Sequence, residues 1–204
     1  MNGHSARGAS AEKRARILES AERVFALKGF FGSKVADIAA EAGVADGTIY
    51  LYFRSKDDLL ISVFEEQMAK VNEALQTAIR GVKDAAEKLR RLIRTWVGLV
   101  EAHPRATEVI TLELRQSAKF MKEYSNPRFA DFLKIIAQVI DEGQKAGLLR
   151  ADVPAPVAAR ALFGLMDELA LMWVTGRGEK FDIRKLADWV SGMVLEGLAE
   201  RRSK

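Results

Sequence analysis

Cysteine is absent from the 204-residue sequence, which excludes disulfides, thiolate nucleophiles and zinc sites that use sulfur ligands. Only two histidines occur, His4 and His103, so a histidine-rich metal site or a Ser-His-Asp triad lacks its imidazoles. The glycines at Gly176 and Gly178 read as a turn, because no predicted strand precedes them as in a phosphate-binding loop. We therefore expect a protein that is not an enzyme and that holds neither a metal nor a cofactor.

Long apolar runs are missing as well. No run of about 18 apolar residues, the length of a membrane-spanning helix, occurs, and no apolar stretch follows the basic residues near the N-terminus. Hydrophobic residues make up 49% and charged residues 29% of the chain, as in folded globular proteins. We therefore expect a folded cytoplasmic protein that is neither secreted nor inserted in a membrane.

Apolar residues do recur at helical spacing along nearly the whole chain, and no alternation lasts long enough to predict a strand. The predicted fold class is all-α, with about nine helices. Gly29 is expected to end the first helix, while Pro104 and Pro127 interrupt the pattern later. The expected helices cover residues 11–28, two short segments up to about 53, and then 56–80, 83–102, 105–120, 127–146, 155–175 and 182–200.

This pattern predicts a mobile tail over residues 1–10, a small domain over 11–56 and a larger one over 57–204. Charge favours the same division. Residues 1–56 hold nine Lys and Arg against six Asp and Glu, a net charge of +3, whereas 57–204 hold 23 against 22. A basic first domain is compatible with a nucleic-acid partner, although a solvated helix face explains three charges equally well.

The most informative motif is SKVADIAAEAGVADGTIYLYF, from Ser33 to Phe53, which has the spacing of a helix-turn-helix. Ala39 is small where two helices must touch, Gly43 suits a turn with positive φ, and Ile49 is placed to fill the core between the helices. Many helical proteins also join two short amphipathic helices at a glycine. The residues that face outward therefore decide whether the motif predicts DNA binding.

Those outward residues suit a DNA groove. Thr48 can contact a thymine methyl, Tyr50 and Tyr52 can donate to phosphates, and Gly47 permits close approach of the backbone. Asp46 either caps the second helix or accepts from a cytosine amino group, and we prefer the cap. The predicted DNA-contacting residues are Ser33, Lys34, Ala45, Asp46, Gly47, Thr48, Tyr50, Leu51, Tyr52 and Lys56.

The run from Ser33 to Leu59 resembles the DNA-binding domain of TetR-family transcriptional repressors. The matching pieces are Ile38-Ala39, Ala42-Gly43-Val44, Gly47-Thr48-Ile49-Tyr50, Tyr52-Phe53 and Lys56. The resemblance covers residues 12–60, and the chain length and helix count extend it to the whole protein. Ser33-Lys34 stands where the family often has two threonines, and Asp46 where serine or a basic residue is commoner. These departures leave the operator sequence open, but they do not change the expectation of DNA binding.

Further segments are similar to the acyl-CoA-responsive regulators of fatty-acid degradation within that family. They are AGVADGTIYLYF, LELRQS at 112–117, Phe163-Gly164, Asp167-Glu168 and Trp173. The resemblance implies a repressor of fatty-acid degradation genes that binds a palindromic double-stranded operator as a homodimer. It further implies that a long-chain acyl-CoA shifts the long fourth helix and releases the DNA.

Dimerisation is implied through a four-helix bundle of the last two helices from each chain. Such a dimer holds its recognition helices about 34–36 Å apart, one turn of DNA, or a multiple of that distance. The last two predicted helices are rich in apolar residues, including Met172, Trp189 and Met193. Packing within one chain explains such a surface too, so the sequence leaves both possibilities open.

The effector site is the least specific prediction. Aromatic and methionine side chains suit an apolar tunnel for a long acyl chain, although ordinary core packing explains each of them as well. Arg115, with Arg105, Arg128, Lys119 and Lys122 nearby in sequence, forms either a surface ion-pair network or a basic mouth for the phosphates of coenzyme A. The predicted effector-contacting residues are Trp96, Leu99, Arg115, Phe120, Phe132, Phe163, Met166 and Trp173.

Two other functions remain open from the sequence. The protein could respond to another hydrophobic ligand, such as a drug, a free fatty acid or a lipid signal, but the basic cluster then has no partner. It could also be a lipid carrier or a coenzyme-A-dependent enzyme, against which stand the missing cysteine and the single internal histidine.

Overall fold

The computed structural model describes residues 3–117, 127–176 and 181–198 of the chain. These residues contain no β-strand and form nine α-helices with one π-helical and one 3-10 turn, which confirms the predicted fold class. The elements are α1 (Gly3–Gly32), α2 (Val35–Ala42), α3 (Asp46–Tyr50), α4 (Lys56–Ile79), α5 (Ala85–Ala102), α6 (Pro104–Glu108), η1 (Val109–Glu113), η2 (Leu114–Gln116), α8 (Pro127–Lys145), α9 (Ala155–Thr175) and α10 (Ile183–Leu198).

Local signals fix several helix ends. At the start of α4 the Ser55 hydroxyl accepts from the Asp58 amide at 3.1 Å, and Asp84 likewise accepts from the Glu87 amide at 2.7 Å before α5. Both contacts satisfy amides that have no partner in the first turn of a helix. α9 ends at Gly176, whose φ of 61° is left-handed.

The helix boundaries differ from the prediction in two places. α1 begins at Gly3, inside the segment for which we expected a mobile tail, and continues past Gly29 to Gly32 with non-helical angles at Gly29 itself. The single helix expected over 105–120 is instead α6 followed by the π and 3-10 turns of η1 and η2. Its expected last residues lie outside the described part of the chain.

The chain divides into two compact units. The first contains the described residues up to 67 and those from 105 to 117, and the second contains residues 68–104 and the described residues from 127 onward. The expected boundary lay at residue 57, with everything beyond it in one domain. The structure instead groups the start of α4, most of α6, and both η1 and η2 with the N-terminal helices.

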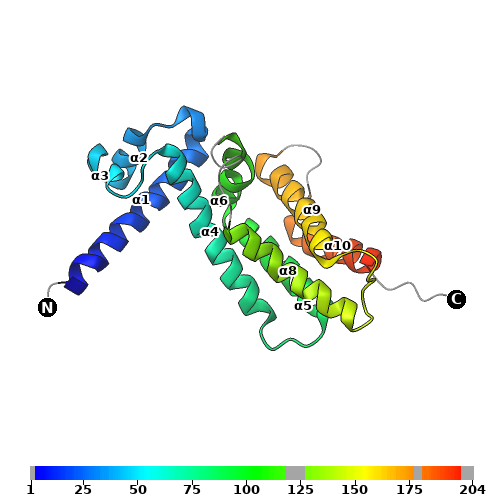
Figure 1. The fold of residues 1–204 in the computed structure, drawn as a ribbon. Helices are drawn as coiled ribbons and strands as arrows, with labels where there is room; N and C mark the ends of the chain where they lie inside the picture. The colour runs from blue at the N-terminus through cyan, green and yellow to red at the C-terminus, as the bar shows by residue number, and fades with distance from the viewer. Residues whose placement is uncertain (1–2, 118–126, 177–180, 199–204) are drawn as a thin grey trace. The chain divides into compact units, whose positions relative to one another are not determined.

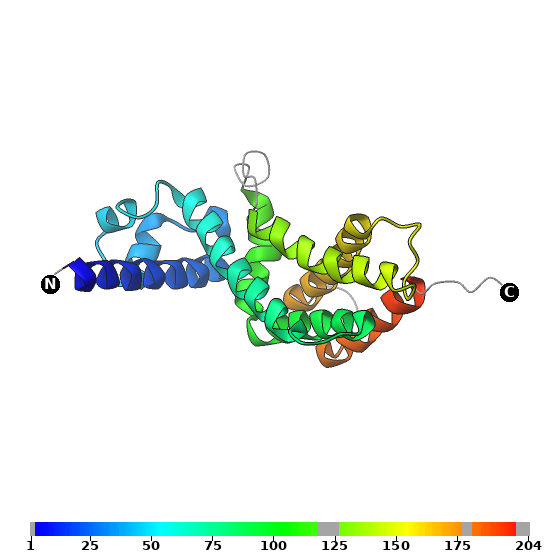
Figure 2. The same ribbon diagram turned by 60° about the horizontal axis from the view of Figure 1, so that its bottom comes forward.

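The first unit is built on α1. In Figure 1 α1, α2 and α3 lie together at the blue end of the colour scale, and Figure 2 shows α1 running beneath α2 and α3. α1 contacts α2 and η1, and α2 contacts α3. The core of this unit consists of fully or nearly fully buried apolar side chains, among them Ile17, Phe25, Ile38, Ile49, Phe53 and Leu59.

The second unit is a helical bundle in which α5 packs against α8 and α10, and α8 packs against α9 (Figure 1). Its interior is apolar and includes Leu89, Ile93, Phe132, Ile136, Ala159 and Val190. α4 begins in the first unit and ends in the second. Among the described residues, no helix has both the length and the apolar character needed to cross a membrane.

Candidate DNA-contact surface and polar groove

The motif between Ser33 and Phe53 forms a helix pair with the predicted turn. α2 ends at Gly43, whose φ of 63° is left-handed, and the amide of the following residue donates to the carbonyl of Ala39 at 3.0 Å. Glycine adopts this backbone without strain. Ile38, Ala39 and Ile49 are at most 1% exposed and lie where α2 contacts α3. The local sequence therefore fixes the helix-turn-helix.

Asp37 ties the first turn of α2 to the end of α1. Its Oδ2 accepts from the Lys34 amide at 2.8 Å, and its Oδ1 accepts from Lys28 Nζ at 2.8 Å. The hydrogen bond from Lys28, followed by the one from the Lys34 amide, holds the pKa of Asp37 below its usual value. The Lys34 side chain remains exposed, as a phosphate contact requires.

Most of the residues on and beside α3 that are predicted to contact DNA are exposed. Tyr50 is 57% exposed and Leu51 is 80% exposed, although both are large side chains. Ala45 and Gly47 are exposed and Thr48 is half-buried. This burial pattern leaves the face accessible to another molecule.

Asp46 departs from its preferred role. The N-cap of α3 is Ala45, and Asp46 is the first helical residue, so the prediction that it caps the helix is wrong. Its exposed carboxylate lies in the first turn, where it interacts favourably with the helix dipole. A contact between Asp46 and a cytosine amino group stays a prediction.

Ser33 and Lys56 make contacts inside the protein. Ser33 is 2% exposed, and its hydroxyl donates to the carbonyl of Phe30 at 2.8 Å. Lys56 Nζ donates to the carbonyls of Phe30 and Ser33 at 2.6 and 2.9 Å and lies 4.5 Å from the centre of the Phe30 ring. These internal contacts argue against the predicted DNA contacts of Ser33 and Lys56, which stay untested predictions.

The N-terminal half of α1 lies beside the helix pair, which the sequence analysis missed. The Ser10 hydroxyl donates to the hydroxyl of half-buried Tyr52 at 3.4 Å, and the Arg14 guanidinium lies 5.3 Å from the centre of the Phe53 ring. Lys13 and Arg16 on the same turns are exposed. The basic run KRAR at residues 13–16 is the signal in the sequence that points to this position.

Six of the eight residues predicted to contact an effector are buried or half-buried in the second unit. Phe132 and Met166 are 1% and 2% exposed in the second unit. The Phe132 ring meets the Phe163 ring edge to face with centroids 5.8 Å apart, which joins α8 to α9. Trp96, Leu99 and Trp173 are half-buried on α5 and α9 and lie at the periphery of the same unit.

The predicted basic cluster is divided between the units. Arg105 and Arg115 are exposed in the first unit, and Arg128 is exposed at the start of α8 in the second. Phe120, Lys119 and Lys122 lie outside the described residues. The described cations therefore do not form one basic mouth within either unit.

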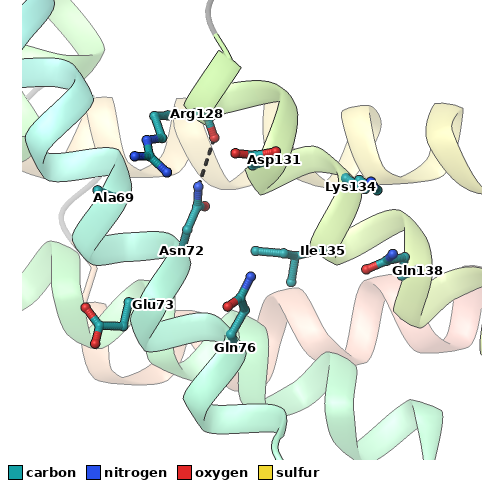
Figure 3. Close-up of a pocket in the computed structure, with 9 residues that line it drawn as sticks. All are labelled: Ala69, Asn72, Glu73, Gln76, Arg128, Asp131, Lys134, Ile135 and Gln138. Atoms are coloured by element: carbon teal, nitrogen blue, oxygen red, sulfur yellow. Dashed lines mark hydrogen bonds between the residues drawn. The ribbon is translucent and has the colours of Figure 1, made fainter.

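A polar groove in the second unit lies between α4 and the first half of α8 and encloses about 460 Å³ (Figure 3). α4 contributes Asn72 and Gln76, and α8 contributes Arg128, Ile135 and Gln138. Sequence reasoning placed only Arg128 near a ligand, because residues of α4 and α8 are far apart in the sequence.

Two features describe the chemistry of this groove. Two cations, Arg128 and Lys134, and two anions, Glu73 and Asp131, line the groove, so their four formal charges cancel. Asn72 is 7% exposed; its Nδ2 donates to the carbonyl of Arg128 at 3.0 Å, while its buried Oδ1 has no hydrogen-bond partner among the described residues. A buried carbonyl oxygen left in this way favours a ligand that donates a hydrogen bond.

The described residues contain no group of three or more His, Cys, Asp or Glu side chains arranged to hold a metal ion.

Two family models match the chain, one for each part. The model described as "Bacterial regulatory proteins, tetR family" matches residues 17–63, and the model described as "YsiA-like protein, C-terminal region" matches residues 64–197. The first match contains the helix pair, and the second contains the groove.

Individual proteins match along most of the chain. The Fatty acid metabolism regulator protein of Bacillus subtilis is 34% identical over 183 residues, which cover 90% of this chain and 94% of that protein. The solved structure of FadR from Bacillus subtilis in complex with stearoyl-CoA superposes with a TM-score of 0.83 at 34% identity, covering 90% of this chain and 98% of that one. The solved structure of FadR from Bacillus halodurans superposes with a TM-score of 0.84 at 33% identity, covering 93% of this chain and 97% of that one.

Proposed function

Because the chain belongs to the TetR family of bacterial transcriptional regulators, we propose that it is a cytoplasmic, non-catalytic repressor of fatty-acid degradation genes. It binds a palindromic operator as a homodimer and releases the operator when a long-chain acyl-CoA binds. The observation that carries this proposal is the 34% identity, over 90% of the chain, to a fatty acid metabolism regulator. This match includes the second unit, where we place the effector, as well as the helix pair of the first unit.

DNA contact is assigned to the exposed face of α3. Thr48 and the backbone at Gly47 face the base edges, while the Tyr50 hydroxyl and the Lys34 ammonium contact phosphates. Lys13 and Arg16 add positive charge on α1. Phosphate contacts supply affinity and base contacts supply specificity, so this surface contains both kinds of group.

The groove between α4 and α8 suits the uncharged pantetheine arm of an acyl-CoA. Pantetheine carries two amides, whose N–H groups match the unpartnered Oδ1 of Asn72 and whose carbonyls match the amide nitrogens of Gln76 and Gln138. Arg128 is positioned to pair with a phosphate at the end of the groove. Ile135, 6% exposed, lies where the groove meets the apolar interior and marks the entry of the acyl chain.

The homodimer is assigned to exposed apolar residues on the last two helices. Trp189 and Met193 are 48% and 55% exposed and lie one turn apart on α10, while Val157 on α9 is 58% exposed. Side chains of this kind are buried in stable interfaces between copies of a protein.

The deciding experiment is calorimetric titration of the purified protein with stearoyl-CoA below its micelle concentration, in parallel with free coenzyme A and with stearate. We expect saturable binding of the thioester that is at least about tenfold tighter than binding of either fragment, because each fragment makes only part of the contacts. Arg128→Ala is expected to weaken stearoyl-CoA binding about tenfold, the usual effect of losing one charge-assisted hydrogen bond.

Lys145→Ala is the matched control, since Lys145 lies at the far end of α8 and pairs with Asp141 at 2.7 Å. This variant should bind stearoyl-CoA as the wild type does. Equal binding of stearate and the thioester would favour a free fatty acid as effector, and no binding of any of the three would refute the acyl-CoA response. Linkage adds a further requirement, because a ligand that weakens DNA binding must itself bind more weakly when DNA is present.

A further inference from the structure

Glu113 is a buried acidic residue at the end of the π-helical turn η1. It is 6% exposed, and its Oε2 accepts a hydrogen bond from the backbone amide of Phe30 at 2.5 Å, across 83 positions of sequence. The segment that carries Glu113 belongs to the first unit, whereas α5 before it and α8 after it belong to the second. Glu113 thus lies on the segment of the first unit that connects two helices of the second unit, α5 and α8.

The backbone of α1 is shaped for this contact. Gly29 has φ 72° and ψ 164°, angles that interrupt the helix and that side chains rarely tolerate. A Cβ atom on Gly29 would lie 3.5 Å from Glu113 Oε2, so the carboxyl group rests directly against the break. Glu113 therefore accepts a hydrogen bond from the first amide after the interruption.

The carbonyl of Phe30 is bonded as well, in part by the start of α4. It accepts from Lys56 Nζ and from the Ser33 hydroxyl, at 2.6 and 2.8 Å. The segment after Glu113 is also tied to α4, because the Ser117 hydroxyl donates to Asp57 Oδ1 at 2.6 Å. These bonds connect the break in α1, the first turn of α4 and the η1–η2 segment into one network.

The η1 segment departs from the bonding of an α-helix. Its residues follow the i to i+5 bonding of a π-helix, and the buried Thr111 hydroxyl donates to the carbonyl of Thr107 at 2.8 Å. A return to the i to i+4 bonding of an α-helix would rotate the residues that follow by about 100°, one residue of helical turn. Such a rotation would withdraw the Glu113 carboxyl group from the Phe30 amide.

We propose that Glu113 is a positioning residue that couples effector binding to DNA binding, an inference that rests on the proposed function. With Glu113 bonded to Phe30, α1 and the helix pair packed on it hold the arrangement that binds the operator. Effector binding moves α5 and α8, which pack against each other, and this movement reaches η1 through the chain that joins α5 to α6. Glu113 then leaves Phe30, and the helix pair shifts from its operator-binding position.

The test compares wild type with Glu113→Ala and Glu113→Gln, the latter keeping an oxygen that can accept from Phe30. Glu108→Ala is the matched control, because Glu108 lies on the same segment but is half-buried. The readout is the dissociation constant for a duplex selected from random-sequence DNA by the wild type, with and without saturating stearoyl-CoA. We expect Glu113→Ala to reduce the ratio of the two constants at least tenfold, Glu113→Gln to retain most of it, and Glu108→Ala to match wild type.

A purely structural role gives a different result. It lowers the melting temperature and the affinity for DNA in both conditions, but it leaves the ratio as in wild type, which would overturn the proposal. If the proposed function itself fails, the wild type shows no response to stearoyl-CoA, so the two failures are distinguishable.

Hydrogen exchange at the Phe30 amide provides a second readout that needs no DNA. In wild type, stearoyl-CoA should accelerate exchange at Phe30 at least tenfold relative to Phe25, which lies before the break. In Glu113→Ala the Phe30 amide should exchange fast without ligand, and stearoyl-CoA should not change its exchange rate. An amide in wild type that stays equally protected while stearoyl-CoA saturates the protein would contradict the proposal.

Discussion

Single side chains in the first unit divide between those that make contacts inside the protein and those that are exposed on the candidate DNA-contact surface. Lys56 and Ser33 satisfy carbonyls inside the protein, while the Lys34 side chain is exposed although its amide is bonded to Asp37. Side-chain type alone did not separate Lys34 from Lys56, because both are lysines beside a helix start. Their burial separates them.

Lys34→Ala tests this division. We expect weaker binding to all DNA sequences alike and a fall of about one in the slope of log affinity against log salt, because one phosphate contact is lost. The helix start should survive, since the Lys34 backbone amide still donates to Asp37. The measurement is fluorescence anisotropy of labelled duplexes over a salt series.

The control is Lys70→Ala, which removes an exposed cation from the part of α4 in the second unit. This variant should keep the wild-type slope. A Lys34→Ala protein with an unchanged slope would remove Lys34 from the proposed interface.

Whole elements depart from ideal helices at two positions that meet each other. α1 is interrupted at Gly29, and the segment after α6 adopts a π turn that ends at Glu113. The Glu113 carboxyl group satisfies the Phe30 amide, and a buried amide without a partner costs about 1–3 kcal/mol. The two irregularities are therefore complementary, because each provides the group that the other requires.

Gly29→Ala tests how much the interruption depends on glycine. The observed angles lie in a region that is nearly exclusive to glycine, and we expect a loss of about 1–3 kcal/mol in the free energy of unfolding. For a chain of this length that corresponds to a melting temperature lower by about 2–4 °C per kcal/mol. Differential scanning calorimetry measures the shift.

Gly98→Ala is the control for this substitution. Gly98 lies inside α5, where an added Cβ atom meets nothing within 4 Å and φ is not positive. Alanine is the better helix former, so stability should rise by up to about 1 kcal/mol. Equal shifts for the two variants would show that the break in α1 does not require glycine.

At the scale of the whole molecule, the proposed function requires two chains. Trp189 and Met193 leave one face of α10 exposed and apolar, whereas the neighbouring Asp188 pairs with Arg94 of the same chain at 3.2 Å. An operator with two half-sites requires two helix pairs held by one interface.

Trp189→Glu is expected to weaken the dimer at least about thirtyfold, the factor that corresponds to losing an aromatic anchor worth about 2 kcal/mol. Sedimentation equilibrium gives the association constant. Operator affinity should fall with it, since a single chain contacts only one half-site. Asp188→Asn should leave the association constant unchanged, and a fully dimeric Trp189→Glu protein would locate the interface elsewhere.

The sequence by itself determined the features that depend on neighbours within a few residues of one another. The all-α fold and the helix-turn-helix at Gly43 follow from spacing and local hydrogen bonding. The family resemblance then extended these features to DNA and effector as partners.

Only the tertiary structure decided the contacts between distant segments. The Glu113 contact to Phe30 spans 83 positions and the Asn72 contact to Arg128 spans 56, and no periodicity in the sequence reports either one. The same holds for the burial of Ser33 and for the start of α3, which places Asp46 after the cap. Helical periodicity records which face of a segment is apolar, but the partner of each polar group is chosen by packing, because it depends on which other segment comes to lie against that face.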